Sequence, residues 1–163
     1  MFSECNSLIY INFTNFNAQN VKDMSSMFSG CYSLKSVDLS SFNIEKLNNL
    51  DSLFYYCTSL IYVNISSFNI ESVTNMNKMF YKCSSLSSID LSKFNTSNVE
   101  TMEQMFYHCS NLTNLDISLF TCSDTDIDII SDLPSIGTLT VNQNFLSKIE
   151  KQIPSNWIIN IKE

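Results

Sequence analysis

Large apolar residues return along this chain at a constant interval of 26 residues. Five segments share the pattern, among them MFSGCYSLKSVDLSSF and MFYKCSSLSSIDLSKF, and they begin at residues 1, 27, 53, 79 and 105. Ten of the twelve phenylalanines, all seven methionines and five of the six cysteines keep fixed positions within the interval. Because the apolar register is what repeats, the pattern predicts a solenoid of stacked units.

Two periodicities alternate within each unit. The spacing of Met24, Met27 and Cys31 is helical and predicts a short helix with one buried stripe. Leu34, Val37 and Leu39 then follow the L-x-x-L-x-L spacing that is typical of a leucine-rich repeat strand. We therefore expect an α/β fold. It is a leucine-rich repeat solenoid with one short parallel strand and one short helix per unit, a curved parallel sheet on the concave face, and ladders of stacked Phe, Met and Cys inside.

The pattern divides the chain into tandem repeats over residues 1–121 and a divergent last repeat with a C-terminal cap over residues 122–163. In the second part, Leu139 and Val141 predict a sixth strand. The segment 145–153 is amphipathic and predicts a helix that ends before Pro154. Residues 157–161 alternate as a final strand, which we expect to cover the last repeat.

The repeat motif N-V-x-x-M-x-x-M-F-x-x-C-x-x-L-x-x-h-D-L-S-x-F-N, with h an apolar residue, is best seen at residues 98–116 and 24–43. It resembles the BspA-like class of leucine-rich repeat proteins over about the first 120 residues. This resemblance implies a cell-surface or secreted protein that takes part in adhesion or in binding other proteins, with no enzymatic activity in the repeats. No binding residues carry over, because that class has no fixed binding motif.

Composition excludes several classes of function. The formal charge is -7 and all nine basic residues are lysines, so a nucleic-acid partner is disfavoured. No apolar run approaches the roughly 20 residues of a membrane span, and the start MFSECNSLIY lacks the features of a signal peptide. Two glycines exclude a Gly-rich phosphate loop, and the single histidine, His108, makes a His-dependent triad or zinc site improbable. We expect no catalytic residues, no metal and no cofactor.

The strand positions that face away from the core carry an acidic and amide row flanked by hydroxyl residues. In a solenoid this row lies on the surface that repeat proteins most often use for binding. It suits a basic protein partner, although the residues also repeat with the architecture and need do no more than hydrogen-bond along it. The candidate residues are Asn12, Asp38, Asn64, Asp90, Asp116, Ser40, Ser66 and Ser92.

A second candidate surface is an aromatic corner. Tyr55, Tyr81 and Tyr107 share one position in successive repeats, and Tyr56 lies beside them in the sequence. Exposed aromatic residues are enriched at protein interfaces, so the corner could anchor a partner. Stacking of the rings between neighbouring repeats explains the same pattern without a partner.

The remaining motifs favour structure over chemistry. A cysteine spacing of 26 matches no zinc motif, and we expect buried free thiols that act as small apolar side chains. Cys122 stands outside that register. Asp124, Asp126 and Asp128 resemble the start of a calcium loop but lack its Gly and closing Glu, so the EF-hand interpretation fails. His108 occupies a variable surface position.

The N-terminal strand, around Ile11, Asn12 and Phe13, has no preceding unit in this sequence and predicts an open sheet edge. Either the chain continues a longer array, or another chain pairs with that edge. Four N-x-S/T sequons are possible glycosylation sites if the protein is secreted. They are Asn12, Asn64, Asn95 and Asn111.

Two hypotheses of function remain. One is a non-catalytic protein-binding or adhesion module of the leucine-rich repeat type. The other is an intracellular structural subunit that contacts a partner in a larger assembly through its N-terminal edge. The resemblance favours the cell surface, whereas the missing signal peptide and the repeated thiols favour the cytoplasm, so the sequence leaves the compartment open.

Overall fold

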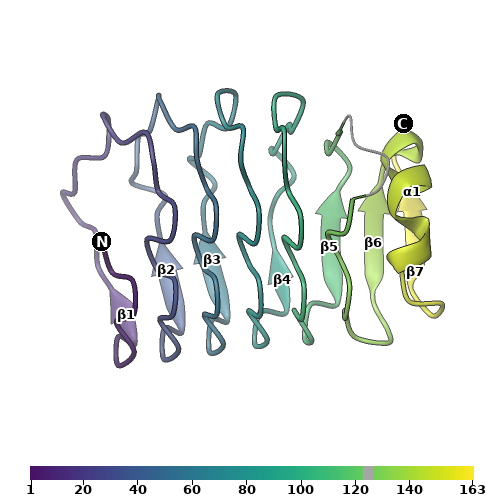
Figure 1. Cartoon of the computed structure of the whole chain (residues 1–163), viewed down its shortest axis with the longest axis horizontal. Coiled ribbons are helices and arrows are strands. Elements are labelled where there is room, and N and C mark those ends of the chain that lie inside the picture. The colour runs from purple at the N-terminus through teal and green to yellow at the C-terminus, as the bar shows by residue number, and fades with distance from the viewer. Residues whose placement is uncertain (123–126) are drawn as a thin grey trace.

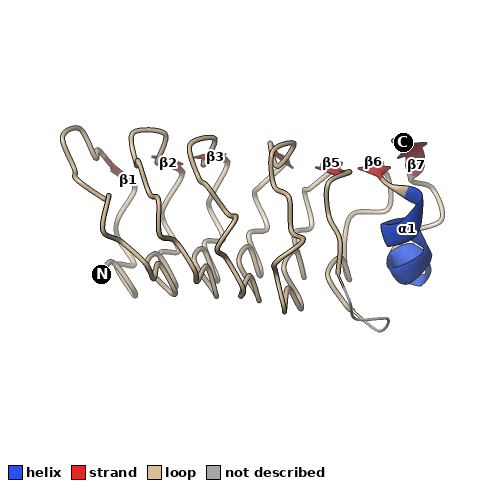
Figure 2. Ribbon diagram, turned by 90° about the horizontal axis from the view of Figure 1, so that it is seen from above, coloured by secondary structure: helices blue, strands red, loops and turns tan. Residues whose placement is uncertain are grey.

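The computed structural model describes residues 1–122 and 127–163, and it shows successive coils of the chain stacked along one axis (Figure 1). Seen from above, the strands run along one side of the stack and the turns along the other (Figure 2). We call the solvent-facing side of the sheets the strand face. The predicted repeat solenoid with parallel strands is confirmed.

Each coil contributes one short strand, and all consecutive strands except the third and fourth pair in parallel. Val37 pairs with Ile11 on one side and with Val63 on the other, so the pairing register equals the sequence interval. Over the described residues the strands form two sheets, β1-β2-β3 and β4-β5-β6-β7. The strands are β1 (Tyr10–Ile11), β2 (Ser36–Asp38), β3 (Tyr62–Asn64), β4 (Ser88–Ile89), β5 (Asn114–Ile117), β6 (Thr138–Val141) and β7 (Ile158–Ile161).

The prediction of a short helix in each repeat is wrong. Between the strands the chain forms successive β-turns, in which the Met27 N–H donates to the Met24 carbonyl and the Cys31 N–H to the Phe28 carbonyl. Intervening N–H groups donate to the next coil instead, as that of Phe28 does to the Leu53 carbonyl at 3.0 Å. These β-turns bring residues three apart to the inside, as a helix does. Apolar spacing could therefore not distinguish the turns from a helix.

Left-handed residues make these turns possible. Ser26 has φ 53° at the third position of its turn, and Gly30 has φ 72° at the third position of the next one. A positive φ at this position is typical of a type II turn. The position of Gly30 is filled by Glu4, Tyr56, Lys82 and His108 in the other coils, all with positive φ. The sequence had shown these residues only as a variable surface position.

One phenylalanine ladder stacks and the other does not. Phe80 lies between Phe54 and Phe106, with ring centroids 5.4 and 5.7 Å away and nearly parallel planes. The second ladder consists of Phe16, Phe42, Phe68, Phe94 and Phe120. Among its described rings, only Phe16 and Phe42 stack, with ring centroids 5.1 Å apart. The second ladder was predicted to stack throughout, but its remaining rings are buried without a stacked partner among the described residues, and Phe120 meets Phe145 edge-on.

The C-terminal helix is confirmed and begins earlier than expected. It is α1 (Gln143–Ile149), followed by the short 3-10 helix η1 (Glu150–Gln152) before Pro154. Asn142 caps α1, because its Oδ1 accepts from the Phe145 N–H at 2.9 Å. Phe145 and Ile149 are buried, so α1 closes the core at this end of the stack.

The final strand covers the last repeat only in part. Trp157 is buried just before β7, and its indole N–H donates to the Pro134 carbonyl at 2.7 Å. Ile159 and Ile161 were expected to cover the repeat, but both are exposed. β7 is the outermost strand of its sheet, so no further coil of the described chain packs on these side chains.

Candidate functional site

The predicted polar row lies on the strand face, where it forms a repeated turn. The Ser40 N–H donates to Asp38 Oδ1 at 2.9 Å, and the same bond recurs in every coil from Asn12 to Asp116. Each carboxylate or amide thus ends its strand with an Asx turn. This bond explains the row structurally. It leaves the second carboxylate oxygen of Asp38 and Asp90 for solvent or a partner, whereas that of Asp116 faces Lys162.

Two aspartates of this row, Asp38 and Asp90, have lowered pKa values. Hydrogen bonds from the Ser40 side chain and backbone hold the pKa of Asp38 below its usual 3.8, and those from Ser92 do the same for Asp90. Both carboxylates are exposed, so the strand face is anionic at neutral pH.

The structure adds an apolar patch that the sequence argument missed. Tyr10 and Tyr62 flank Ser36 on the strand face, with 74% and 54% of their surface exposed. Ile9 and Ile61, just before them, are also exposed. We call these four residues the strand-face patch. The signal was the Ile-Tyr pair at 9–10 and 61–62, which puts apolar side chains at strand positions that the other repeats fill with Lys-Ser, Ser-Ser or Thr-Asn.

A groove adjoins the patch. It has a volume of about 230 Å³ and lies between β3 and β4, where the two sheets meet without a ladder. Tyr62 forms part of one wall, and Ser88 and Asp90 form part of the other. An aromatic wall and a carboxylate therefore share one hollow of the strand face.

The aromatic corner is brought together as predicted. Tyr81 stacks on Tyr55 and on Tyr107, with ring centroids 5.0 Å apart in both pairs, and Tyr56 lies 4.6 Å from Tyr55. Lys82 Nζ donates to the Tyr56 hydroxyl at 2.7 Å and also lies over its ring. The hydrogen bond from Lys82 to this hydroxyl raises the pKa of Lys82. Because Tyr81 is stacked on both faces, the corner is half-buried and not a free aromatic surface.

His108 has partners that the sequence did not indicate. Its Nε2 lies 3.4 Å from an Asp132 carboxylate oxygen, and its ring meets Tyr107 edge-on. It therefore closes the aromatic corner at one end.

The N-terminal edge differs in detail from the prediction. β1 comprises Tyr10 and Ile11, so the exposed backbone edge begins with Tyr10, and Asn12 lies beyond the strand. Phe13 is turned inward, with its ring 4.9 Å from that of Phe42. Phe13 thus belongs to the core and not to the pairing edge.

The cysteine ladder consists of free thiols, as expected. Four of them are buried, and each Sγ donates to the carbonyl of a phenylalanine in the preceding coil, as Cys83 does to Phe54 at 3.1 Å. Burial raises the pKa of the Cys109 thiol to about 12 and that of Cys83 well above its usual value. These thiols are therefore protonated and unreactive at neutral pH.

Metal-binding side chains do not gather in the part of the chain that the structure describes, where no group of three His, Cys, Asp or Glu could hold an ion. Of the three aspartates of the rejected calcium loop, Asp124 and Asp126 lie outside the described residues, and Asp128 accepts from the Ser131 hydroxyl. No described helix is long and apolar enough to cross a membrane.

The four sequons lie at or near the surface. Asn12, Asn95 and Asn111 are exposed, and Asn64 is half-buried. Glycosylation at these positions stays a prediction.

The fold places the protein among parallel repeat solenoids. Residues 1–62 and 38–129 match the model of the family described as Mycoplasma protein of unknown function, DUF285. The chain belongs to this family. Comparisons with curated proteins and with solved structures gave no match.

Proposed function

We propose that this protein is a non-catalytic protein-binding or adhesion module that recognises another protein through its strand face. The observation that carries the proposal is the exposure of Tyr10 and Tyr62 on the sheet. Tyrosines at the centre of interfaces contribute much of the binding energy in protein complexes. The resemblance to BspA-like leucine-rich repeat proteins supports an adhesive role.

The chemistry of the strand face selects the partner. The patch is flanked by Asp38 and Asp90, whose carboxylates stay ionised at neutral pH, and Lys35 lies between Ile9 and Ile61 in the pairing order. A partner with apolar side chains surrounded by Lys or Arg complements this surface. The overall charge of -7 steers such a partner toward the protein.

The aromatic corner is the weaker candidate for the interface. Stacking covers both faces of Tyr81 and one face each of Tyr55 and Tyr107, whereas the ring of Tyr62 has no ring partner among the described residues. The stacked rings stabilise neighbouring coils by about 0.5–1.5 kcal/mol per pair. We assign the corner to the architecture.

A pull-down with matched variants tests the proposal. The wild-type protein, Tyr62→Ala and Tyr81→Ala are immobilised and exposed to extracts of the organism that makes the protein and of its host. We expect one protein to bind wild type and Tyr81→Ala and to be lost with Tyr62→Ala. A captured protein that is lost with Tyr81→Ala and kept with Tyr62→Ala would place the interface on the turn side and refute the proposal. Turnover of a substrate by the purified protein would refute the non-catalytic assignment.

A second function, a structural subunit of a larger intracellular assembly, is supported by the end of the stack at β1. The outer backbone edge of Tyr10 and Ile11 is unpaired within the described chain. A separate cavity of about 150 Å³ is lined by residues of the first two coils, among them Met1, Phe16 and Met24. A strand from another chain would satisfy the edge. N-glycans on the native protein would contradict the intracellular subunit.

A further inference from the structure

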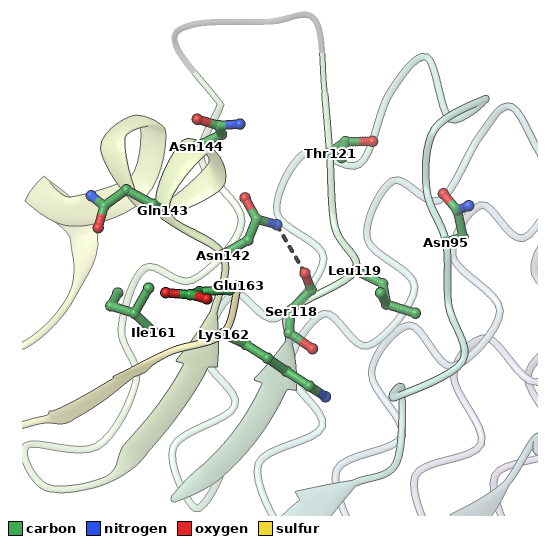
Figure 3. A pocket seen from close by; sticks show the side chains of 10 residues that line it. All are labelled: Asn95, Ser118, Leu119, Thr121, Asn142, Gln143, Asn144, Ile161, Lys162 and Glu163. Atoms are coloured by element: carbon green, nitrogen blue, oxygen red, sulfur yellow. Dashed lines mark hydrogen bonds between the residues drawn. The ribbon is translucent and has the colours of Figure 1, made fainter.

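A hollow of the described surface lies at the carboxyl ends of β5, β6 and β7. Its volume is about 500 Å³, which is within the range of small-ligand pockets, about 300–1,000 Å³. Figure 3 shows hydrogen-bonding side chains around its rim and Leu119 and Ile161 on its walls. The polar residues that line it are Asn95, Ser118, Thr121, Asn142, Gln143, Asn144, Lys162 and Glu163.

Ser118 has an unpartnered hydroxyl in this pocket. The residue is only 6% exposed, and its Oγ has no hydrogen-bond partner. In Figure 3 the Ser118 side chain lies between those of Leu119 and Lys162. Leaving a buried hydroxyl without a partner costs free energy, so such groups are rare in folded proteins.

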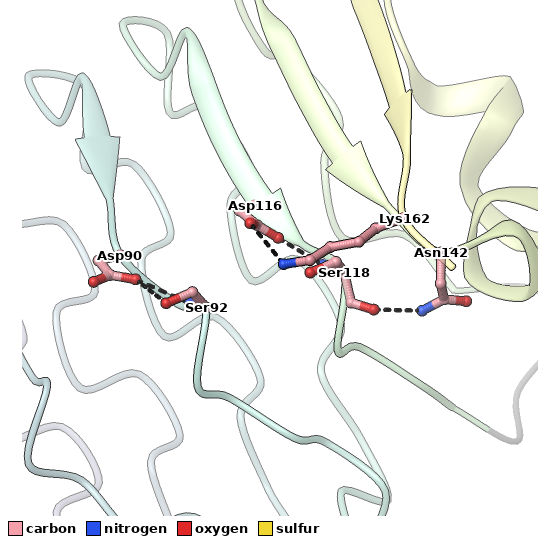
Figure 4. Close-up of polar contacts among 6 residues, drawn as sticks. All are labelled: Asp90, Ser92, Asp116, Ser118, Asn142 and Lys162. Atoms are coloured by element: carbon pink, nitrogen blue, oxygen red, sulfur yellow. Dashed lines mark hydrogen bonds and ion pairs between the residues drawn. The ribbon is translucent and has the colours of Figure 1, made fainter.

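The repeat itself shows that this is unusual. One coil earlier, the Ser92 hydroxyl donates to Asp90 Oδ1 at 2.7 Å, and Ser66 makes the corresponding bond to Asn64. In the last regular coil only the Ser118 N–H donates to Asp116 (Figure 4), and the hydroxyl makes no hydrogen bond. The same sequence position thus has a satisfied hydroxyl outside the pocket and an unsatisfied one inside it.

The side chain next to this hydroxyl is held weakly. Lys162 extends across the end of β5, and its Nζ lies 3.9 Å from an Asp116 carboxylate oxygen (Figure 4). Lys162 is largely exposed, and exposed ion pairs contribute about 0–1 kcal/mol. A ligand can therefore displace this lysine and reach Ser118.

The lining indicates a neutral ligand rich in hydroxyl groups. Asn95, Gln143 and Asn144 each bring an amide, which both donates and accepts, and the Asn95 Nδ2 and both Gln143 and Asn144 side chains make no hydrogen bond to the described protein. The charge of Lys162 is balanced by Asp116 and Glu163 is close by, which disfavours an anion.

We propose that this pocket is a saccharide-binding site, in which the rim amides bind ring hydroxyls, Leu119 and Ile161 contact the apolar face of the sugar, and Ser118 receives a hydroxyl at the floor. This site is separate from the strand-face patch, which lies on β1 and β3.

Nuclear magnetic resonance titration of the full-length protein tests the site. The probes are glucose, galactose, mannose and N-acetylglucosamine, each added singly, with inorganic phosphate as the anionic comparison. We expect at least one sugar to shift the side-chain amide signals of Asn95, Gln143 and Asn144 in a saturable way, with phosphate inactive. No saturable shift with any of the four sugars, or an equal response to phosphate, overturns the proposal.

Matched variants separate binding from folding. Ser118→Ala removes a hydroxyl without a partner, so we expect its melting temperature to equal or exceed that of wild type while sugar affinity falls about 2- to 10-fold. Ser92→Ala, the same change one coil away, is expected to leave sugar affinity unchanged. Wild-type affinity in Ser118→Ala, or a lower melting temperature with unchanged affinity, shows a structural hydroxyl and overturns the proposal.

The rim is tested in the same way. Asn95 and Asn69 occupy the same repeat position, and each Oδ1 accepts a backbone N–H two residues on at 3.0 Å. Asn95→Ala and Asn69→Ala therefore lose the same turn bond. Only Asn95→Ala is expected to weaken sugar binding, and an equal effect of both variants contradicts the site.

Discussion

Replacing one ring of the stacked phenylalanine ladder tests how the coils hold together. Phe80 is fully buried between two parallel rings, whereas Phe94 is equally buried and has no ring partner within the described chain. A change from Phe to Leu at either site loses a similar packing contribution, about 1 kcal/mol. At Phe80 it also removes two ring pairs worth about 0.5–1.5 kcal/mol each. We therefore expect Phe80→Leu to cost about 1–3 kcal/mol more than Phe94→Leu.

The assay is urea unfolding followed by far-ultraviolet circular dichroism. Both variants should keep the wild-type dependence of unfolding free energy on urea, so that the shift in midpoint reports stability. Equal midpoints for Phe80→Leu and Phe94→Leu would refute the reasoning, because the stacked geometry would then add nothing to burial.

Three other predictions concern charge, thiols and turn geometry. Hydrogen bonds lower the pKa of Asp90, so its contribution to the free energy of unfolding is present above pH 3.8 and is lost as the pH falls through the folded-state pKa. Asp90→Asn should leave the urea midpoint at pH 7 nearly unchanged and reduce the fall of that midpoint in acid. A thiol reagent at pH 8 should label at most Cys5 and Cys122 in the native protein and all six cysteines in denaturant; rapid labelling of all six before unfolding would contradict the buried ladder. Gly30→Ala should cost about 1–2 kcal/mol in urea unfolding, because φ is 72° there, and an unchanged midpoint would contradict the left-handed turn.

Sequence periodicity predicts the parallel coils because the apolar residues keep one register, and Val37 pairs with Ile11 and Val63 as that register requires. It could not predict the turns. The β-turns point Met24, Met27 and Cys31 inward, as a helix would. The turns differ from a helix in the backbone N–H groups that donate to the next coil. Whether an N–H donates within its own segment or to the next coil depends on the neighbouring coil, which local spacing does not describe.

The candidate site also has features that the sequence could predict and features that it could not. The polar row could be predicted because strand alternation fixes which residues face outward. The exposure of Tyr10 and Tyr62 follows from that same rule, yet large apolar residues are ordinarily assigned to the core. The Ser118 pocket could not be found from sequence, because Ser118 and Ser92 occupy the same repeat position. Only the structure shows that the Ser118 hydroxyl is buried without a partner while the Ser92 hydroxyl donates to Asp90.

Recognition of a protein through the strand face is the central claim, and a hydrogen-exchange footprint tests it most directly. The protein is compared alone and with the partner captured in the pull-down. We expect added protection to centre on β1 to β3 around Tyr10 and Tyr62, with the turn segment around Tyr81 unchanged. Protection centred on Tyr81 and its stacked neighbours, with the strands unaffected, would contradict the account.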